Sequence, residues 1–336
     1  APAWAAEVDA LFATWDKPGS PGCALGVIQD GKLVHARGFG EASLEHGVKI
    51  TPETVFDIGS TSKQFTAAAI GLLVQDGKVE VEQELHEWIE ELPDFGADVT
   101  LDHMLHHTSG LPDYIGLMTA DEADVTTPAQ ALEALTKVER LHFEPGTRFE
   151  YSNTNFFLLS LVVERASGQP FHEFARARIF APLGMDSTQL FHDHTLVIPH
   201  RACAYAPRKA GGFRVYMSDW EQLGDGAVQT SLLDLARWDA NFYTHTVGGD
   251  ALQAFLHART PLSGGNPNEY ARGLFVAQFL GRERVSHGGA WAGYRAELMR
   301  FPADRTTIVC LANLASMNPT GLCEQVAALV LPKPAK

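Results

Sequence analysis

The sequence contains few cysteines. Four occur among 336 residues, and no two are spaced as a Cys-x-x-Cys pair, which excludes the common zinc and redox motifs of that form. Three of the four lie in apolar strand-like or helical segments, where a free thiol is usually buried. We therefore expect buried free thiols rather than one of the three possible disulfide pairings for these residues: Cys23, Cys203, Cys310 and Cys323.

Long apolar runs and basic residues are also scarce. No stretch approaches the roughly 18 consecutive apolar residues of a membrane-spanning helix, so we expect no membrane span. The chain has 26 Lys and Arg residues against 41 Asp and Glu, a formal net charge of −15. Nucleic acids and anionic membranes bind clustered Lys and Arg. We expect neither partner, and we interpret the charge as a solubility feature.

The hydrophobic content, turn signals and apolar periodicity of the sequence indicate a globular protein with strands at both ends and helices between them. The 45% hydrophobic content of 336 residues suffices for one large domain or two interleaved ones. An Asp30-Gly31 turn predicts a hairpin of residues 23–29 and 32–38. Apolar periodicity predicts the remaining elements: helices at 3–15, 60–75, 101–107, 128–137, 156–166, 171–180, 232–242 and 319–331, and strands at 274–280, 284–287, 293–301 and 306–313.

This order predicts an α/β fold of the α+β type. One antiparallel sheet is built from both ends of the chain and flanked by the terminal helices, and a mainly helical domain is inserted in the middle. We place the discontinuous sheet domain at residues 1–58 and 245–336 and the helical domain at residues 59–244.

The pair Ser60 and Lys63 is the first chemically informative feature. It occurs where a strand-like stretch gives way to a helical pattern, and residues three apart lie on the same face of a helix. A serine becomes a nucleophile when a base takes its proton and donors stabilise the oxyanion. Ser60 as a simple helix N-cap is the alternative; Lys63 argues against it, because an ammonium group in an apolar helix needs polar partners.

Two later segments supply further polar groups. Tyr151 and Asn153 follow a Pro-Gly turn, and His287 precedes two glycines that allow close approach to backbone N–H groups. The three motifs, Ser-x-x-Lys, Tyr-x-Asn and His-Gly-Gly, occur in that order. In this combination the chain resembles the serine β-lactamase and penicillin-recognising superfamily, in the branch of class C β-lactamases, D,D-peptidases, D-aminopeptidases and related esterases. The resemblance extends from about residue 20 to the C-terminus.

The resemblance implies a two-lobed fold with the active site in the cleft between the lobes. It implies that Ser60 is acylated, that Lys63 and Tyr151 exchange its proton, and that Asn153 binds a substrate carbonyl. Whether Lys63 or Tyr151 is the base stays open. The backbone N–H groups of Ser60 and Ala290 are the implied oxyanion hole, next to Gly288 and Gly289.

His287 departs from the pattern of the β-lactamases, which typically carry Lys-Thr-Gly here. A histidine is mostly neutral at pH 7, and Gly288 replaces a threonine that could bind the substrate carboxylate. Both changes weaken the case for a β-lactamase and favour the peptidase branch. Arg295 restores a positive charge if it faces the cleft; an outward-facing arginine is the alternative.

We therefore expect a serine hydrolase that forms an acyl-enzyme on a small peptide, ester or β-lactam. A D-amino-acid peptidase, of the D,D-carboxypeptidase or D-aminopeptidase type, or an esterase is the first hypothesis. A class C-like β-lactamase is the second, and a non-catalytic penicillin-binding scaffold or sensor the third. Loss of Ser60, Lys63, Tyr151 or His287 would have favoured that third hypothesis.

We expect no cofactor and no metal. The histidines at 103, 106 and 107 lack an acidic partner at ligand spacing, and those at 192 and 194 belong to a polar loop. The resemblance is to exported proteins, and residues 1–3 do not begin a signal peptide. We therefore expect a periplasmic or secreted protein whose signal peptide is absent from this chain. Oligomeric state is left open.

Overall fold

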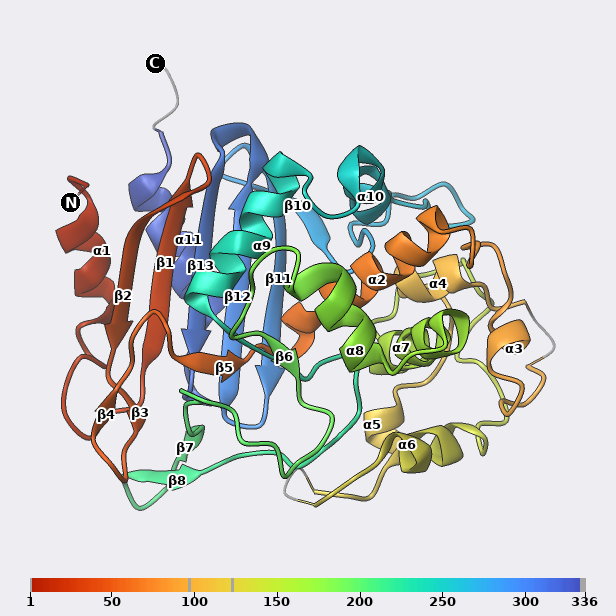
Figure 1. Cartoon of the computed structure of the whole chain (residues 1–336), viewed down its shortest axis with the longest axis horizontal. Coiled ribbons are helices and arrows are strands. Elements are labelled where there is room, and N and C mark those ends of the chain that lie inside the picture. The colour runs from red at the N-terminus through yellow and green to blue at the C-terminus, as the bar shows by residue number, and fades with distance from the viewer. Residues whose placement is uncertain (1, 96–97, 122–123, 333–336) are drawn as a thin grey trace.

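A six-stranded antiparallel sheet forms one half of the protein (Figure 1). The computed structural model describes residues 2–95, 98–121 and 124–332. The strand order is β10-β11-β12-β13-β1-β2, so the first strands of the chain complete a sheet made by the last ones. The strand bounds are β1 Cys23–Gln29, β2 Lys32–Phe39, β10 Phe275–Phe279, β11 Arg282–Trp291, β12 Tyr294–Phe301 and β13 Thr306–Ala312.

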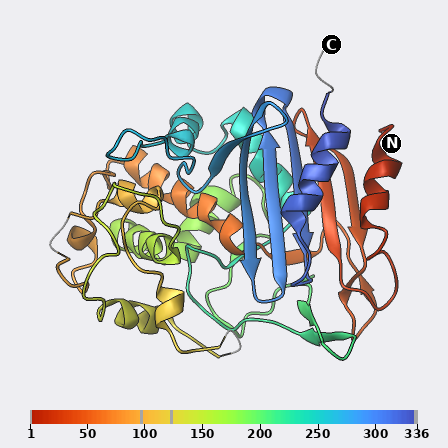
Figure 2. The same cartoon turned by 180° about the vertical axis from the view of Figure 1, so that it is seen from behind.

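Two layers of helices cover the sheet. Helices α1 (Ala5–Phe12) and α11 (Pro319–Val330) pack on one face, and α9 (Leu232–Thr244) packs on the other (Figures 1 and 2). Alternation along β1 creates both cores, because successive side chains of a strand point to opposite faces. Leu25 joins the core beneath α1 and α11, and Ala24 joins the core on the α9 side.

The helical half is built around α2 (Lys63–Gln75). Eleven of its 13 residues are buried, as expected of a helix surrounded by other elements. Gly71 permits one close contact: a Cβ atom there would lie 2.7 Å from Phe255 of α10. The other helices are α3 Leu85–Trp88, α4 Leu101–Leu105, α5 Tyr114–Leu117, α6 Pro128–Leu135, α7 Asn153–Ser167, α8 Phe171–Ala175 with a π-turn at Arg176–Phe180, and α10 Gly249–His257.

The predicted fold class is confirmed, with an antiparallel sheet, flanking terminal helices and a helical region between them. The four cysteines are free; three are buried and Cys203 is half-buried. No helix in the described ranges is long and apolar enough to cross a membrane. The domain limits stay a prediction, and their outermost residues, 1 and 333–336, lie outside the described part of the chain.

Several element bounds differ from expectation. The helix expected at 60 opens with a 3-10 turn, Gly59–Ser62; α7 begins at Asn153 rather than 156, and β11 runs on to Trp291. A small sheet of β5 (Val55–Asp57), β9 (Val228–Ser231) and β6 (Gln189–Leu190) lies within the mainly helical stretch. Strands of two to four residues are too short to show a period of two. The remaining short strands are β3 Glu41–Ser43, β4 Val48–Lys49, β7 Tyr205–Pro207 and β8 Phe213–Val215.

Candidate active site

Ser60 lies in the 3-10 turn between β5 and α2, and it is the member of that turn turned toward open space. The buried carboxylate of Asp57 accepts the Gly59 N–H at 2.7 Å and so fixes the start of the turn. The hydroxyl of Thr61 donates to the His287 carbonyl, and that of Ser62 accepts the N–H of residue 228. Both neighbouring hydroxyls are therefore buried in structural bonds, whereas Ser60 is half-buried and lines two cavities.

Lys63 is completely buried and contacts three oxygen atoms. Its Nζ donates to Asn153 Oδ1 at 2.8 Å, to the Asp225 carbonyl at 2.6 Å and to Ser60 Oγ at 3.0 Å. The first two oxygens can only accept, so each fixes one N–H of Lys63. The third position faces Ser60, where an ammonium donates and a neutral amine accepts the serine proton. The contact is thus a direct proton path between Ser60 and Lys63.

Asn153 is held by an acidic neighbour as it begins α7. Asp113 Oδ2 accepts both the backbone N–H of Asn153, at 3.0 Å, and its side-chain amide, at 2.8 Å. The amide oxygen is thereby turned toward Lys63. One amide hydrogen stays available for a substrate carbonyl.

Tyr151 packs its ring over the lysine and leaves its hydroxyl without a protein partner. Lys63 Nζ lies 4.9 Å from the ring centroid, and the phenol oxygen is buried with no hydrogen bond in the described structure. On its other side the ring stacks on His107, with centroids 4.2 Å apart. Nδ1 of His107 accepts the N–H of Ser152 at 3.2 Å. The tyrosine is thus fixed by packing, and its hydroxyl is free to exchange a proton with a ligand or with Ser60.

His287 is a buried, neutral histidine. Its Nδ1 lies 2.7 Å from the Gly288 carbonyl, which only accepts, so Nδ1 carries the proton. Nε2 then accepts from the Tyr270 hydroxyl at 3.0 Å. Burial, together with the charge of Lys63, lowers the pKa of His287 to about 3. The third motif therefore places no positive charge in the cleft at neutral pH.

The glycines after His287 let β11 approach the nucleophile. A Cβ atom on Gly289 would lie 1.8 Å from the Ile58 carbonyl oxygen, and one on Gly59 would lie 2.7 Å from the Ala290 nitrogen. Side chains at these positions would push the strand away from the turn that carries Ser60. The approach places the Ala290 N–H beside Ser60, as an oxyanion hole requires.

Gly288 faces the opposite side of β11, toward a buried acid. A Cβ atom there would lie 3.0 Å from Glu297 Oε2, which accepts the Thr320 hydroxyl at 2.6 Å. Burial raises the pKa of Glu297 to about 7. The volume that a side chain at 288 would use is thus partly taken by Glu297.

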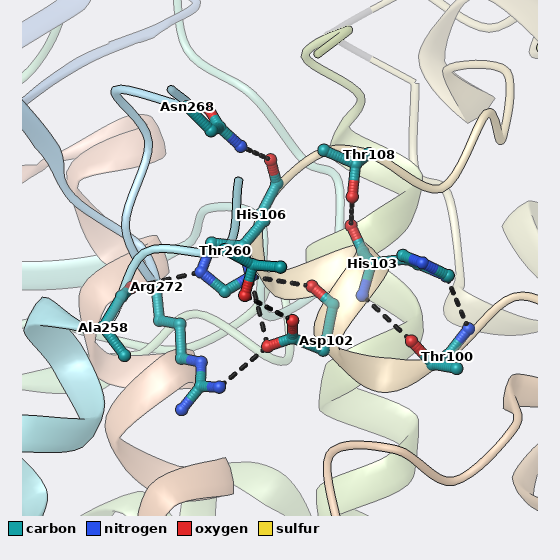
Figure 3. A network of polar contacts seen from close by, with 9 residues as sticks. All are labelled: Thr100, Asp102, His103, His106, Thr108, Ala258, Thr260, Asn268 and Arg272. Atoms are coloured by element: carbon teal, nitrogen blue, oxygen red, sulfur yellow. Dashed lines mark hydrogen bonds and ion pairs between the residues drawn. The ribbon is translucent and has the colours of Figure 1, made fainter. Parts of the chain in front are cut away.

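A polar network links α4 to the segment of Ala258, Thr260 and Arg272 (Figure 3). Asp102 of α4 contacts the ring of His106 at 3.2 Å and Arg272 at 2.7 Å. Burial acts to raise the pKa of Asp102, but His106 and Arg272 outweigh it and hold the pKa below its usual range. The network ties α4 to residues 258–272, and so fixes the segments that carry the rings beside Tyr151 and His287.

Comparison with known protein families matches residues 8–329 to the family described as Beta-lactamase. The chain belongs to the beta-lactamase family. The predicted resemblance and the predicted class, a β-lactamase-related serine hydrolase, are confirmed at the level of the family.

Three similar proteins illustrate the breadth of the beta-lactamase family. A D-aminopeptidase of Gluconobacter oxydans is 29% identical, with 96% of this chain and 61% of the relative covered. Penicillin-binding protein 4* of Bacillus subtilis is 29% identical, with 85% and 66% covered. This chain thus spans less than two thirds of either relative. The structure of the octameric penicillin-binding protein homologue from Pyrococcus abyssi has a TM-score of 0.85 at 27% identity, covering 97% of this chain and 77% of that one.

Two cavities meet at Ser60 and Ala290 in this family member. The first, about 160 Å³, lies on the side of Asn153, Trp220 and Asp225. The second, about 570 Å³, contains Tyr151, His287, Gly288, Gly289 and Arg295, together with the start of α11. The predicted site residues are therefore brought together around one serine, and their catalytic roles stay predictions.

Arg295 lines the second cavity, but its guanidinium group is engaged by the backbone. Its Nη1 donates to the carbonyls of Ala292, at 2.9 Å, and Tyr294, at 2.6 Å. Burial lowers its pKa. Arg295 thus provides a partly satisfied positive charge at the edge of this cavity.

Sequence reasoning missed four residues of the site: His107, Asp113, Asp225 and Tyr270. They stand alone in sequence and reach the cleft only through tertiary contacts. The nearest signals were the Thr-Ser-Gly after His107 and the Gly-Asp-Gly around Asp225.

The polar loop around His194 contains the one group in the described chain with metal-ligand geometry, formed with Asp193 and Glu221. All three are half-exposed, and the His194 ring contacts Glu221 at 2.8 Å.

Proposed function

We propose that this protein is a serine hydrolase that cleaves amide or ester bonds through an acyl-enzyme on Ser60, and that its substrates are of the D-aminopeptidase type. The contact that carries the proposal is Lys63 Nζ to Ser60 Oγ, 3.0 Å, in a site where the other two contacts of Lys63 are fixed. The name of the Gluconobacter relative supports the substrate class.

The geometry supports the following proposed reaction. Lys63, as the neutral amine, takes the proton of Ser60 while Oγ bonds to the substrate carbonyl carbon. The N–H groups of Ser60 and Ala290 stabilise the oxyanion. When the tetrahedral intermediate collapses, the Tyr151 phenol gives its proton to the leaving nitrogen or oxygen, and the Lys63 ammonium returns a proton to Tyr151. Water then attacks the acyl-enzyme by the same steps and releases the acid.

The position of Tyr151 assigns the two cavities. A group that protonates the leaving atom must lie beside it, and Tyr151 lines the second cavity only. The leaving group therefore occupies the second cavity, and the acyl group occupies the first, next to Asn153.

A class C-like β-lactamase is the second candidate, supported by the family and by the penicillin-binding relative. Two observations favour the peptidase over it. His287 is neutral, and the charge of Arg295 is shared between two backbone carbonyls. Carboxylate-bearing β-lactams thus meet a weaker positive field than a lysine at 287 would supply.

The proposal is tested by active-site labelling and a substrate panel. A fluorophosphonate should form one adduct on Ser60, and Ser60→Ala should lose more than about a thousandfold in activity. The matched control is Ser187→Ala, at an exposed serine remote from the cleft. This variant should keep both the labelling of Ser60 and the hydrolytic activity. D-aminoacyl amides, D-Ala dipeptides, p-nitrophenyl esters and a cephalosporin then rank the substrates. An unlabelled protein without hydrolysis of any of them would support a non-catalytic scaffold instead.

A further inference from the structure

Asp225 is an acid beside the nucleophile for which the proposed reaction has no proton-transfer role. Its backbone carbonyl accepts from Lys63 at 2.6 Å, and its side chain lines the first cavity together with Ser60. The residue is 8% exposed. Burial raises its pKa to about 6, against the opposing charge of Lys63. At pH 7.5 the carboxylate is therefore mostly ionised.

Three carboxylates surround Ser60, and they differ in what they already bind. Asp57 receives one N–H on each oxygen. Asp113 receives a backbone N–H on Oδ1, and a backbone and a side-chain N–H on Oδ2. Asp225 Oδ2 accepts the Tyr114 hydroxyl at 3.0 Å, and its own backbone N–H is its other donor. No further side-chain donor reaches it in the described part of the chain. Among these three acids, Asp225 is thus the one whose Oδ1 accepts from no other residue that the structure describes, and this oxygen can accept from a ligand.

The rest of the first cavity is mostly apolar. Trp220 and Trp291 form an edge-to-face pair with centroids 5.1 Å apart, and both line the space beside Ser60. The guanidinium group of Arg201 also lines this cavity, and its central carbon lies 4.4 Å from the centroid of the Phe191 ring. Burial raises the pKa of Asp57 to about 6 and also raises the pKa of Tyr294, and the charge of Arg201 opposes both shifts, so this charge acts on that side of the cavity. A ligand with an apolar body and one cationic group at the carboxylate of Asp225 fits this distribution.

We propose that Asp225 binds the α-ammonium group of an aminoacyl substrate whose apolar side chain lies against Trp220 and Trp291. The inference rests on the proposed function and narrows it to amino-acid amides, esters or peptides with a free N-terminus. An α-ammonium nitrogen lies two covalent bonds from the carbonyl carbon that Ser60 attacks. Asp225 and Ser60 line the same cavity, so the carboxylate and the attacked carbonyl carbon face a common space.

The competing role for Asp225 is that of a counter-ion for Lys63. The two roles predict that removal of the charge slows the hydrolysis of different sets of substrates. A counter-ion affects every substrate, because Ser60 activation is common to all. An ammonium-binding residue affects only substrates that carry the ammonium group.

The experiment compares three substrates: D-phenylalanine p-nitroanilide, its N-acetyl derivative, and the p-nitrophenyl ester of 3-phenylpropanoic acid, which lacks the amine. The wild type should prefer the free amine over the N-acetyl compound by about tenfold or more in kcat/KM. Asp225→Asn should raise KM for the free amine by about tenfold to a hundredfold, the range of a charged hydrogen bond. The ratio between the first two substrates should fall toward one. Asp186→Asn, an exposed acid without a hydrogen bond to its side chain, controls for net charge.

A second variant keeps the test informative if Asp225→Asn folds poorly in thermal melting. Tyr114→Phe removes the hydroxyl that orients Asp225, and it should raise KM for the free amine by about threefold to tenfold. Equal losses on all three substrates would assign Asp225 to Lys63 and overturn the inference. So would an unchanged KM, or a wild type that cleaves the ester but prefers the N-acetyl compound. In these cases Ser60 is still labelled and the proposed hydrolase stands, whereas an unlabelled Ser60 and no cleavage would reject both.

Discussion

Gly289 of β11 and Ile58, two residues before the nucleophile, are in direct backbone contact. A Cβ atom on Gly289 would lie 1.8 Å from the Ile58 carbonyl oxygen and 3.0 Å from the Thr61 hydroxyl. Neither neighbour is the flexible end of a long side chain, so the strand itself would have to move. The distance between Ser60 and Ala290, the proposed oxyanion donor, therefore depends on the absence of a side chain at 289.

Gly289→Ala should separate β11 from the Ser60 turn. We expect kcat/KM to fall by about tenfold or more for all substrates, since displacement of oxyanion donors is costly, with a loss of about 1–3 kcal/mol in stability from overpacking. Steady-state kinetics and denaturant unfolding measure the two effects. In Gly264→Ala the nearest atom to the new Cβ lies at 3.9 Å. This control should change neither kcat/KM nor stability. Full activity in Gly289→Ala would show that the contact does not set the oxyanion geometry.

Tyr151→Phe tests the proton relay. The hydroxyl has no protein partner among the described residues, so its removal should leave the melting temperature nearly unchanged. We expect kcat to fall by roughly a hundredfold or more, the scale of general acid–base catalysis. Tyr243→Phe makes the same change at a remote tyrosine and should keep full activity. Parallel losses of activity and stability in Tyr151→Phe would instead indicate a structural residue.

His287→Lys tests the missing charge of the third motif. The neutral imidazole should leave the cleft poorly suited to substrates with a carboxylate next to the scissile bond. A lysine should narrow the gap in kcat/KM between a cephalosporin and a neutral p-nitrophenyl ester by about tenfold to a hundredfold. Arg295→Ala, measured beside it, should raise KM selectively for the carboxylate substrate if Arg295 reaches the ligand. A wild type that turns over cephalosporins near the diffusional ceiling, about 10⁷ M⁻¹s⁻¹ or above, would make β-lactamase the correct function.

Glu297→Gln should stabilise the protein at alkaline pH. Burial raises the folded-state pKa of Glu297 from 4.5 to about 7, so the folded state holds its proton more tightly than the unfolded chain does. Wild-type stability should therefore decline as the pH rises from about 4.5 through 7, by about 3 kcal/mol. The glutamine does not titrate. The difference in melting temperature between variant and wild type should grow between pH 5 and 8.5, and Glu53→Gln, an exposed control, should show no such trend.

The sequence predicted best those features that are local. The strand at 23–29 was predicted to the residue, because Asp30-Gly31 adopts the left-handed conformation that a tight hairpin needs, with φ of 50° and 72°. The start of α7 was missed because Ser152, Asn153 and Thr154 show no apolar period, although Asn153 already lies in the helix. The strand-like stretch expected before Ser60 is β5, whereas its partners β9 and β6 are too short to be predicted from a period of two.

The same distinction applies to the site. Ser60, Lys63, Tyr151 and His287 belong to short motifs and could be selected from the sequence. The low pKa of His287 follows from its burial and from the charge of Lys63, and its hydrogen bond with Tyr270 joins residues that no sequence pattern connects. The role inferred for Asp225 depends in the same way on a cavity formed by residues from several segments.

The pairing of β1 with β13 has a consequence for biosynthesis. Cys23 lies opposite Ala312, so the sheet cannot close until residue 312 has left the ribosome. During that time the β1–β2 hairpin presents an unpaired edge, and exposed edges favour intermolecular pairing. Contacts between such distant residues also slow folding. A chain truncated before Thr306 would keep Ser60 and Lys63 but would leave β1 without its neighbour on that side, and it should aggregate rather than accumulate as a smaller enzyme.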